Sequence, residues 1–450
     1  MTRHEEIDLG LPYKHILESL EDKGFESYLV GGCIRDYLLG REVYDIDITT
    51  RARPDDIRRI FADKKVIDFG QKYGTIKVID KSIGYEITTF RKDGSYKDKR
   101  HPDGVSFSDS IYEDLQRRDF TINAMAYRRG EIIDPFGGKA ELGKKIIRTV
   151  GDPYERIGED MLRSMRAVRF ATSLGFDIEE DLKSAIRDRS SEIESISADR
   201  IRDELSKILL AEKPSRGIRI LDELGLLDYI LPEVKAMVGF DQHSSFHHMD
   251  LFEHSLAVME KLPSDLALRL AGLFHDTGKV STMFIDDRGE GRFFGHPQDS
   301  EKIIDNRLRK LHYPKKIIEE VKILALRHMD SANTYTKKSV RKHLRMMGEE
   351  TFRKLLVLQM ADTLSTSRPN PDNIEGAREL IDEVKELNIP IKRSSLAING
   401  NDLKEIGYKE GKIIGDSLSY IENLVEDEVI ANDKEEIIKF LTKKVLFLDR

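Results

Sequence analysis

The sequence predicts an α/β (α+β) head with a mixed sheet, followed by a remainder that is entirely α-helical. β-rich and helical runs alternate over residues 1–151, which is the pattern of a sheet covered by helices. From about Asp152 onward, almost every apolar run has helical spacing. Histidines cluster between His243 and His343, which marks a separate region inside the helical part. We therefore expect a head, a helical neck, a body and a helical tail, at residues 1–151, 152–235, 236–368 and 369–450.

The head elements follow from local patterns. Strands are predicted at 26–30 and 43–49, with a helix at 33–39 between them and a second helix that begins at Pro54. Two β-rich runs at 74–80 and 85–90, joined by the short segment 81–84, predict an antiparallel hairpin.

The helical part has clear start and stop signals. Asp152-Pro153 begins a predicted helix whose apolar positions continue from Ile157 to Ala171, and Gly175 ends it. Ser197 is the predicted cap of a later helix. Segment 367–371, which contains two prolines, is the predicted linker before the tail.

Composition excludes several classes of protein. The 450 residues contain 39% hydrophobic and 35% charged side chains, which is typical of a folded chain and not of a disordered one. No segment is apolar enough for a membrane helix or a secretory signal, and the single cysteine, Cys33, fits a reducing compartment, so we expect a cytoplasmic protein. The net charge of −8 argues against a histone-like polyanion binder.

A glycine turn lies between the first strand and the first helix of the head. Gly31 and Gly32 precede Arg35, and glycines at this place let backbone N–H groups approach a phosphate at a helix N-terminus. Gly-Gly turns are also common structural elements. The turn by itself therefore leaves both interpretations open.

Two carboxylates follow on the next strand. Asp45 and Asp47 are two residues apart, so both point to one face of a strand while Ile46 and Ile48 face the core. Such close like charges repel each other unless a cation lies between them. Oxygen ligands at this spacing suit Mg²⁺ shared with a nucleoside triphosphate, and two such ions activate a hydroxyl and stabilise departing pyrophosphate. The alternative is a solvated Asp pair on an exposed face.

These motifs resemble a known family. The run Gly31-Gly32-x-x-Arg35-Asp36-x-Leu38-Leu39-Gly40, then Asp45-x-Asp47, resembles the signature of class II tRNA nucleotidyltransferases, the CCA-adding enzymes, and of related bacterial poly(A) polymerases. The runs Arg117–Ala124 and Ile133–Gly138 resemble the next motifs. The resemblance implies that Asp45 and Asp47 hold the catalytic metals and that Gly32, Arg35 and Arg118 contact the nucleotide phosphates. Glu86 is a candidate third carboxylate.

A further run resembles the helix of the same family whose side chains recognise the nucleotide base. Asp160 and Arg163 are three residues apart, so on a helix they project together. A carboxylate accepts from the exocyclic amine of cytosine or adenine, and a guanidinium donates to the ring nitrogen, whereas uracil and guanine present a carbonyl instead. The alternative is an ordinary ion pair. The resemblance makes Arg166 and Arg169 neighbouring nucleotide contacts, and no nucleic acid template is needed.

Basic segments offer places for RNA. Five basic residues lie within 91–100, at the position of the loop that the family associates with the switch from C to A addition. Further basic runs at 128–129 and 144–148 suit an RNA backbone. The loop is otherwise typical of a solvated surface segment.

The body contains a third set of motifs. His254, the adjacent pair His275-Asp276 and the distant Asp362 lie in predicted helices, and they resemble the HD superfamily of metal-dependent phosphohydrolases. The resemblance makes these four residues ligands of a divalent transition metal of unknown identity, and imidazole favours such ions over Ca²⁺. His296 and His328 are candidates for a second metal or for the phosphate, and His247 and His248 are candidate neighbours. A metal-free HD fold is the alternative.

Together these motifs predict transfer of CMP and AMP from CTP and ATP onto a tRNA 3′ end, with Mg²⁺ in the head. A second, phosphohydrolase activity in the body is expected to act on a 2′,3′-cyclic or terminal phosphate of a damaged tRNA end. An A-adding enzyme or poly(A) polymerase is one alternative, and an HD phosphohydrolase with an RNA-binding head is another. The sequence indicates no membrane partner and leaves the oligomeric state open.

Overall fold

The computed structural model describes residues 12–43, 45–68, 74–93, 105–243, 249–332, 334–386, 396–426 and 429–448. The chain divides into two compact units, Met1–Pro232 and Glu233–Arg450. The division into head, neck, body and tail stays a prediction.

A mixed sheet forms the centre of the head, as the sequence predicts. Within the described residues it has seven strands, in the spatial order β3 (Lys65–Asp68), β4 (Thr75–Asp80), β5 (Ile83–Thr89), β2 (Ile46–Thr50), β1 (Ser27–Val30), β8 (Ala126–Arg128) and β9 (Glu131–Ile133). Strands β2 and β5 run parallel, and every other neighbouring pair is antiparallel. β1 is buried along its whole length because it lies in the middle of the sheet.

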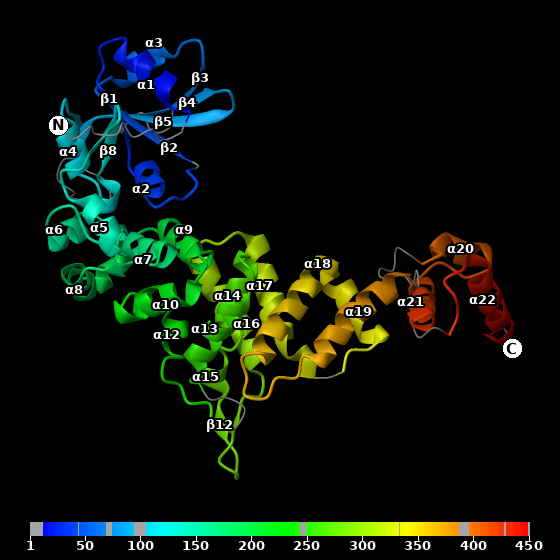
Figure 1. Cartoon of the computed structure of the whole chain (residues 1–450). Coiled ribbons are helices and arrows are strands. Elements are labelled where there is room, and N and C mark those ends of the chain that lie inside the picture. Colours follow the sequence, from blue (N-terminus) through cyan, green and yellow to red (C-terminus); the bar gives the residue numbers. More distant parts are fainter. Residues whose placement is uncertain are drawn as a thin grey trace. The chain divides into compact units, whose positions relative to one another are not determined.

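Helices cover both faces of this sheet. Figure 1 shows α1 (Lys14–Glu21) and α3 (Pro54–Ile60) on one face and α2 (Gly32–Leu38) on the other. Pro54 is the first residue of α3, as expected. The remaining elements of the head are β6 (Arg91–Asp93), β7 (Val105–Phe107), α4 (Ile111–Gln116), α5 (Gly138–Lys144) and β10 (Ile146–Ile147).

The predicted hairpin is present as β4 and β5, but its turn is tighter than expected. The turn consists of Lys81 and Ser82 alone, both with positive φ, so Ile83 and Gly84 already belong to β5. Two consecutive positive φ values are typical of the hairpin turn that matches strand twist. The strand predicted at 43–49 is also shorter at its start, because β2 begins at Ile46.

Helices make up the rest of the first unit. They are α6 (Pro153–Glu159), α7 (Leu162–Leu174), α8 (Glu180–Asp188), α9 (Ala198–Leu209), α10 (Pro214–Glu223) and α11 (Leu227–Ile230), with the short strand β11 (Asp177–Ile178); α12 (Pro232–Lys235) spans the boundary to the second unit. α7 packs against α9 and α10. Gly175 ends α7 in the left-handed conformation, and Ser197 occupies the N-cap position of α9, so both predicted boundaries are confirmed, although the Ser197 side chain makes no capping hydrogen bond.

The single helix predicted from Asp152 to Ala171 is wrong. Asp152 does cap α6, since its side chain accepts from the Glu155 N–H at 3.0 Å. Asp160 then adopts an extended conformation (φ −151°, ψ 104°), which ends α6, and α7 begins two residues later. The apolar spacing continues across this break, so periodicity alone does not reveal it.

In its described residues, the second unit is helical apart from one small hairpin. Its elements are α13 (Leu251–Lys261), α14 (Leu266–Phe274), α15 (Lys279–Thr282), β12 (Phe284–Ile285), β13 (Gly291–Arg292), α16 (His296–Lys310), α17 (Lys315–Arg327), α18 (Lys337–Thr363), α19 (Asp372–Glu386), α20 (Gly400–Glu405), α21 (Lys412–Glu426) and α22 (Lys434–Leu448). α13, α14, α17 and α18 pack on one another. Gly348 interrupts α18 with non-helical backbone. The last three helices contribute to a hydrophobic core of their own around Leu403, Ile421 and Ile437.

Within the described ranges, no helix combines the length and apolarity needed to cross a bilayer.

Candidate functional site

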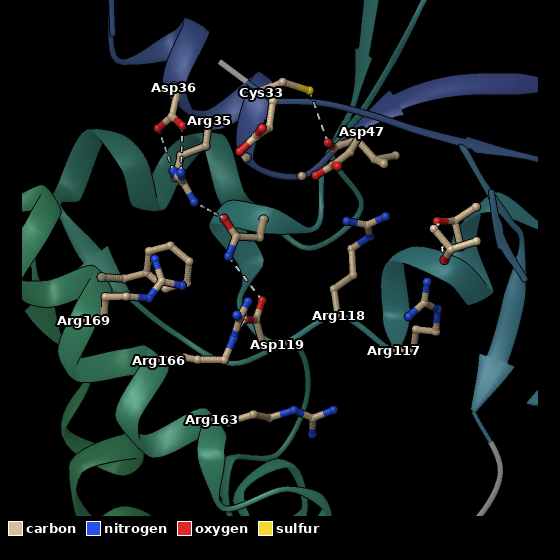
Figure 2. A pocket seen from close by; sticks show the side chains of 18 of the residues that line it. Cys33, Arg35, Asp36, Asp47, Arg117, Arg118, Asp119, Arg163, Arg166 and Arg169 are labelled. Atoms are coloured by element: carbon tan, nitrogen blue, oxygen red, sulfur yellow. Dashed lines mark hydrogen bonds and ion pairs between the residues drawn. The ribbon is translucent and has the colours of Figure 1, made fainter. Parts of the chain in front are cut away.

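A cavity of about 870 Å³ lies within the first unit, and every candidate residue predicted for nucleotide transfer lines it except Glu86, the candidate third carboxylate. These residues are Gly32, Arg35, Asp45, Asp47, Arg118, Asp160, Arg163, Arg166 and Arg169. They come from the glycine turn, from the start of β2, from the segment after α4 and from the α6–α7 region. Figure 2 shows arginine side chains projecting toward this space from different elements. The roles assigned to the individual residues stay predictions.

The two carboxylates differ in their surroundings. Asp45 precedes β2 and is exposed, whereas Asp47 lies within the strand, in register with Glu86 on β5. Burial raises the pKa of Asp47 to about 6; Arg118 opposes this shift, while the charges of Glu86 and Asp45 add to it. A cation bound at such a cluster of carboxylates makes their ionisation more favourable.

Gly31 makes the close approach at this site possible. Its φ is +77°, and a Cβ built on it would lie 3.0 Å from Arg118 Nη1 and 3.7 Å from Asp47 Oδ2. A larger residue would therefore strain the backbone and displace the arginine. Gly32 begins α2 directly after this turn, so the start of the helix faces the cavity.

Arg35 and Arg118 are each held by a carboxylate. Arg35 donates two bonds to Asp36, at 2.9 and 2.8 Å, and a third to Asn123 Oδ1 at 2.6 Å. Arg118 donates to Asp114 at 3.2 Å. Burial would raise the pKa of Asp114, but Arg117 and Arg118 keep it below its usual value. Two guanidinium groups in fixed positions suit the recognition of a triphosphate.

The arginines of α7 surround an aromatic ring. Arg166 Nε donates to Asp119 at 2.7 Å, and Arg169 Nε donates to Glu204 at 2.6 Å. The guanidinium of Arg169 lies 3.9 Å from the centre of the Phe170 ring. Although burial would raise the pKa of Asp119, Arg166 lowers it to about 2, so this pair stays ionised.

Asp160 and Arg163 line the same cavity, but they are not neighbours on one helix as expected. Asp160 lies in the break between α6 and α7, where its carboxylate accepts from Arg200 Nη2 at 2.6 Å and from Nη1 at 3.3 Å. Arg163 forms an ion pair with Glu159 and donates to the Arg156 carbonyl at 2.8 Å. Each member of the predicted base reader is thus held by a separate partner.

Sequence reasoning missed three residues that line the cavity. Asn123 forms hydrogen bonds with both Arg35 and Asp119. The ring of Phe170 contacts the guanidinium of Arg35, and Arg200 donates to the Asp160 carboxylate. Asn123 lies inside a recognised motif, four residues after Asp119, so its position was the available signal. Arg200 comes from α9, and nothing in its local sequence indicates that it contacts Asp160.

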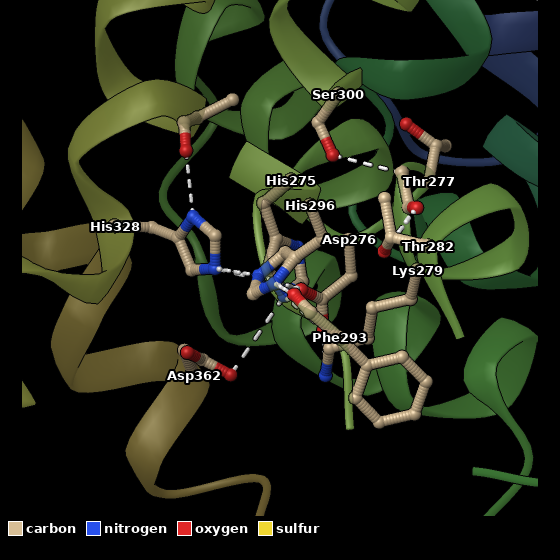
Figure 3. Close-up of polar contacts among 12 residues, drawn as sticks. His275, Asp276, Thr277, Lys279, Thr282, Phe293, His296, Ser300, His328 and Asp362 are labelled. Atoms are coloured by element: carbon tan, nitrogen blue, oxygen red, sulfur yellow. Dashed lines mark hydrogen bonds and ion pairs between the residues drawn. The ribbon is translucent and has the colours of Figure 1, made fainter. Parts of the chain in front are cut away.

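A second cluster occupies the core of the other unit (Figure 3). The four predicted ligands meet there: His254 Nε2 lies 3.1 Å from Asp362 Oδ1, and His275 Nε2 lies 3.2 Å from Asp276 Oδ2. The other approaches, from His254 to Asp276 and from His275 to Asp362, are both 3.8 Å. Side-chain exposure is 3% or less for three of them and 22% for Asp362, which marks the open side.

The cluster includes two further histidines. The Nε2 atoms of His296 and His328 lie 3.3 and 3.4 Å from Asp276 Oδ1. His247 and His248 lie outside the described residues, as does most of the basic loop predicted near 91–102.

Buried charges in this cluster shift one another's pKa values. Burial would raise the pKa of Asp276, but His275 and Lys279 hold it well below its usual range. Burial lowers the pKa of His328. The pKa of His275 is raised, because the effect of the Asp276 carboxylate is larger than the opposing effect of burial. Lys279 Nζ lies 2.7 Å from Asp276 Oδ2 and donates to Gln242 Oε1 at 2.9 Å.

Three family models match the chain. The poly(A) polymerase head domain matches residues 27–148, and the probable RNA- and SrmB-binding site of polymerase A matches residues 175–238. The tRNA nucleotidyltransferase domain 2 (putative) matches residues 296–441. The first two matches contain most of the residues that line the cavity.

Relatives match along nearly the whole chain. A CCA-adding enzyme of Geobacillus sp. is 34% identical over 437 residues, which is 96% of each protein. A CCA-adding enzyme of Latilactobacillus sakei is 34% identical over 433 residues, covering 94% of this chain and 96% of the relative.

A solved structure agrees with these matches. The Bacillus stearothermophilus CCA-adding enzyme in complex with CTP superposes with a TM-score of 0.74 at 30% identity, covering 100% of this chain and 99% of the other. The sequence motifs, the mixed sheet followed by helices, and the full-length similarity agree with one another. This chain therefore belongs to the family of CCA-adding enzymes, the tRNA nucleotidyltransferases.

Proposed function

We propose that this protein adds CMP and AMP, from CTP and ATP and without a nucleic acid template, to restore CCA at the 3′ end of tRNA. The observation that carries the proposal is the single cavity that gathers the carboxylate pair, the glycine turn, the arginines and the predicted base reader. Family membership supports the same reaction.

The carboxylates fit a divalent cation such as Mg²⁺, which this family uses. Asp45 and Asp47 would hold it, with Glu86 beside Asp47 in register. Burial of Asp47 and the neighbouring negative charges raise its pKa, and a bound cation would oppose this shift. When bound, Mg²⁺ neutralises triphosphate charge and promotes attack by a hydroxyl group.

The residues of the chain itself orient the nucleotide. Arg35 and Arg118 belong to different sequence motifs, and both line the cavity, where they offer hydrogen-bond donors to the phosphates. The turn at Gly31 and Gly32 lets the backbone approach the phosphates. Arg200 occupies part of the Asp160 carboxylate, which leaves lone pairs for the exocyclic amine of a base. Arg163 can donate to a ring nitrogen on exchanging a bond with Glu159.

Incubation with tRNA that lacks its CCA end tests this function. CTP alone should extend the tRNA by C only, CTP with ATP should complete CCA, and ATP alone should add nothing. ATP alone should, however, extend tRNA that already ends in CC. An A-adding enzyme would extend only the last substrate, and a poly(A) polymerase would add many A residues from ATP alone.

Replacing Asp160 by alanine is expected to loosen base selection. Uracil and guanine would no longer place a carbonyl against the half-buried Asp160 carboxylate. An unpaired acceptor covered by the bound base costs about 1–3 kcal/mol, so selection should fall about ten-fold or more. The measurement is kcat/KM for each of the four nucleoside triphosphates.

Two further variants complete this test. Arg200→Gln should shift selection in the same direction, since Arg200 positions the carboxylate. Arg187→Gln, which removes the surface ion pairs with Glu180 and Glu223 outside the cavity, is the matched control. Unchanged C and A selection by Asp160→Ala would place base reading elsewhere.

The second unit supports a second candidate activity, hydrolysis of a phosphoester at an RNA end. The observation that favours it is the convergence of two imidazoles and two carboxylates, in which the Nε2 atoms of His254 and His275 each lie 3.1–3.8 Å from an oxygen of Asp276 and of Asp362. Neighbouring ligands of one ion lie about 3.0–3.4 Å apart when each bond is near 2.1 Å, so the set needs little movement to bind.

The donor set favours one kind of metal over another. Two imidazoles and two carboxylates suit Ni²⁺, Mn²⁺, Zn²⁺ or Co²⁺ better than Ca²⁺. When bound, such an ion makes water a stronger nucleophile and polarises a phosphoryl oxygen. Removal of a 2′,3′-cyclic or terminal phosphate would restore the hydroxyl group that nucleotide addition requires. Both proposed activities would therefore serve one RNA terminus.

A further inference from the structure

A single side chain links two of the arginines that line the cavity. Asn123 Oδ1 accepts from Arg35 Nη1 at 2.6 Å, and Asn123 Nδ2 donates to Asp119 Oδ1 at 3.2 Å. The other oxygen of Asp119 accepts from Arg166 Nε at 2.7 Å. The hydrogen bonds that run from Arg35 to Asp119 can be followed in Figure 2. One continuous series of hydrogen bonds therefore connects Arg35 to Arg166.

The linked arginines have different predicted roles. Arg35 lies on α2, next to the glycine turn, and is a candidate contact of the nucleotide phosphates. Arg166 lies on α7, three residues after Arg163 of the predicted base-recognition pair. Asn123 comes from neither helix, because it ends the short 3₁₀ helix Thr121–Asn123. Its side chain therefore joins the predicted phosphate side of the cavity to the predicted base side.

The two neighbours of Asn123 require opposite hydrogen-bonding groups. A guanidinium only donates and an ionised carboxylate only accepts, so the amide oxygen faces Arg35 and the amide nitrogen faces Asp119. Although burial would raise the pKa of Asp119, the charge of Arg166 lowers it to about 2, so this carboxylate is ionised. Asn123 is buried, which limits the access of water to both partners. The place therefore suits a neutral side chain with one acceptor and one donor.

Like charges make such a link useful. The guanidinium carbons of Arg35, Arg166 and Arg169 lie 4.9, 5.6 and 3.9 Å from the centre of the Phe170 ring. Three positive charges around one ring repel one another, so each needs a partner that fixes its position.

Asp36 alone does not fix Arg35 relative to α7. Asp36 is the next residue on α2, so its two bonds to Arg35 hold the guanidinium only relative to that helix. The bond to Asn123 adds a connection that continues through Asp119 to Arg166. A guanidinium has five N–H donors, and Arg35 uses three of them in these bonds. The network thus sets the direction in which the other donors meet a ligand.

We propose that Asn123 is a positioning residue that couples recognition of the triphosphate to recognition of the base. It holds Arg35 directly and Arg166 through Asp119, so a nucleotide bound by one arginine finds the other already in place. The inference rests on the proposed nucleotide addition and adds to it a residue that acts through two others.

Asn123→Leu removes both hydrogen bonds and nearly keeps the shape of the side chain. Because both lost bonds involve charged groups, kcat/KM for CTP and for ATP should fall about ten-fold or more. The KM for tRNA should stay within about two-fold, since the network holds groups that face the nucleotide. The measurements use CTP with tRNA that lacks its CCA end, and ATP with tRNA that ends in CC.

Asn123→Asp gives a readout that a loss of packing would not give. When ionised, the introduced carboxylate opposes the charge of Asp119 and has no donor. When protonated, its O–H donates to Asp119 and its carbonyl accepts from Arg35, as the amide does. The protonated fraction above the pKa of this group rises about ten-fold for each pH unit. The ratio of kcat/KM for this variant to that of the wild type should therefore rise as pH falls from about 8 to about 6.

The ratio to the wild type removes the titrations that both proteins share. Burial raises the pKa of Asp47 to about 6, so a loss of rate at low pH is expected in both. The charged groups on the elements around Asn123 are also common to both, namely Arg35, Asp36, Arg118, Asp119, Lys139, Glu141, Lys144, Arg166 and Arg169.

Two controls accompany the pH profile. Asn123→Leu has no proton to gain, so its ratio to the wild type should not change with pH. Gln116→Glu also converts an amide to a carboxyl group in the first unit, at an exposed position that does not line the cavity. The ratio for this variant should stay near one throughout.

Arg35→Gln tests whether Asn123 acts through Arg35. Effects of residues in one hydrogen-bond network are not additive. Asn123→Leu should therefore lower kcat/KM by a smaller factor in the Arg35→Gln background than in the wild type. Equal factors in the two backgrounds would show that Asn123 does not act through Arg35 and would overturn the coupling.

The outcomes separate this inference from the function on which it rests. A wild-type chain that adds neither C nor A would overturn both. Normal CCA addition by the wild type, together with normal kcat/KM for Asn123→Leu or a pH-independent ratio for Asn123→Asp, would overturn the positioning role alone. Circular dichroism and thermal unfolding identify any variant whose fold has changed. If Asn123→Leu does not fold, the pH profile of Asn123→Asp decides.

Discussion

Asp47→Asn is expected to abolish nucleotide addition while the fold persists. The change removes one ligand charge from the site where a divalent cation would bind the triphosphate. Such a cation stabilises the transition state by several kcal/mol, so the rate should fall about 10³-fold or more. Asp45→Asn should act in the same direction. The measurement is single-turnover addition of labelled C to tRNA without its CCA end.

Stability should respond differently from activity. The pKa of Asp47 is raised to about 6 in the folded, metal-free chain, well above its usual value. Ionisation at neutral pH therefore disfavours the folded state, and this unfavourable contribution is present above the folded pKa and disappears as pH falls below the usual value. Asparagine removes the charge, so the free energy of unfolding without Mg²⁺ should be unchanged or higher.

A surface carboxylate serves as the control for this prediction. Asp68 lies on β3 of the same sheet, pairs with Arg58 and does not line the cavity. Asp68→Asn should keep normal addition. Near-normal addition by Asp47→Asn would refute the metal assignment, and a large loss of stability would show that Asp47 has a structural role instead.

The second large effect is expected from His275→Ala combined with Asp276→Ala. These residues supply ligand atoms at the centre of the buried cluster, so the variant should lose its bound transition metal and its phosphoester hydrolysis, the latter by about 10³-fold or more. CCA addition should stay within about two-fold, because its cavity lies in the other unit. Metal analysis and both activities are measured on one preparation.

The substrates for this comparison are a tRNA that ends in a terminal phosphate and the same tRNA with a 2′,3′-cyclic phosphate. His343→Ala is the control, since it changes a buried histidine outside the cluster. If the wild-type chain binds no transition metal and hydrolyses neither end, the second unit has no such activity. If the double variant also loses CCA addition while remaining folded, the two activities are not separate.

Local patterns predicted most elements of the head, because short-range physics decides them. The strands at β1, β4 and β5 and the start of α3 at Pro54 follow from alternation and from the fixed φ of proline. The break at Asp160 did not follow, since apolar positions keep their helical spacing on both sides of it. A tertiary contact with Arg200 accompanies the break, and no local pattern reports such a contact.

Motif order located the residues of both clusters, but it did not give their geometry. The sequence placed Asp160 and Arg163 on one helix, whereas the structure gives each a different partner. It also left the role of His296 and His328 open between a metal and a phosphate. Their ring orientations depend on the carbonyls of Phe293 and Ala325, which only the folded backbone brings into place.

The six clustered side chains come from five separate helical regions: α13, the end of α14, the start of α16, the end of α17 and α18. An ion held by them would cross-link these regions, and a cross-link that exists only in the folded state stabilises it in proportion to the logarithm of ion concentration. Chelation should therefore lower the melting temperature of this unit. The lifetime of the folded protein, as well as its activity, would then depend on the supply of metal ions. Folding of the second unit would likewise depend on the metal content of the cell.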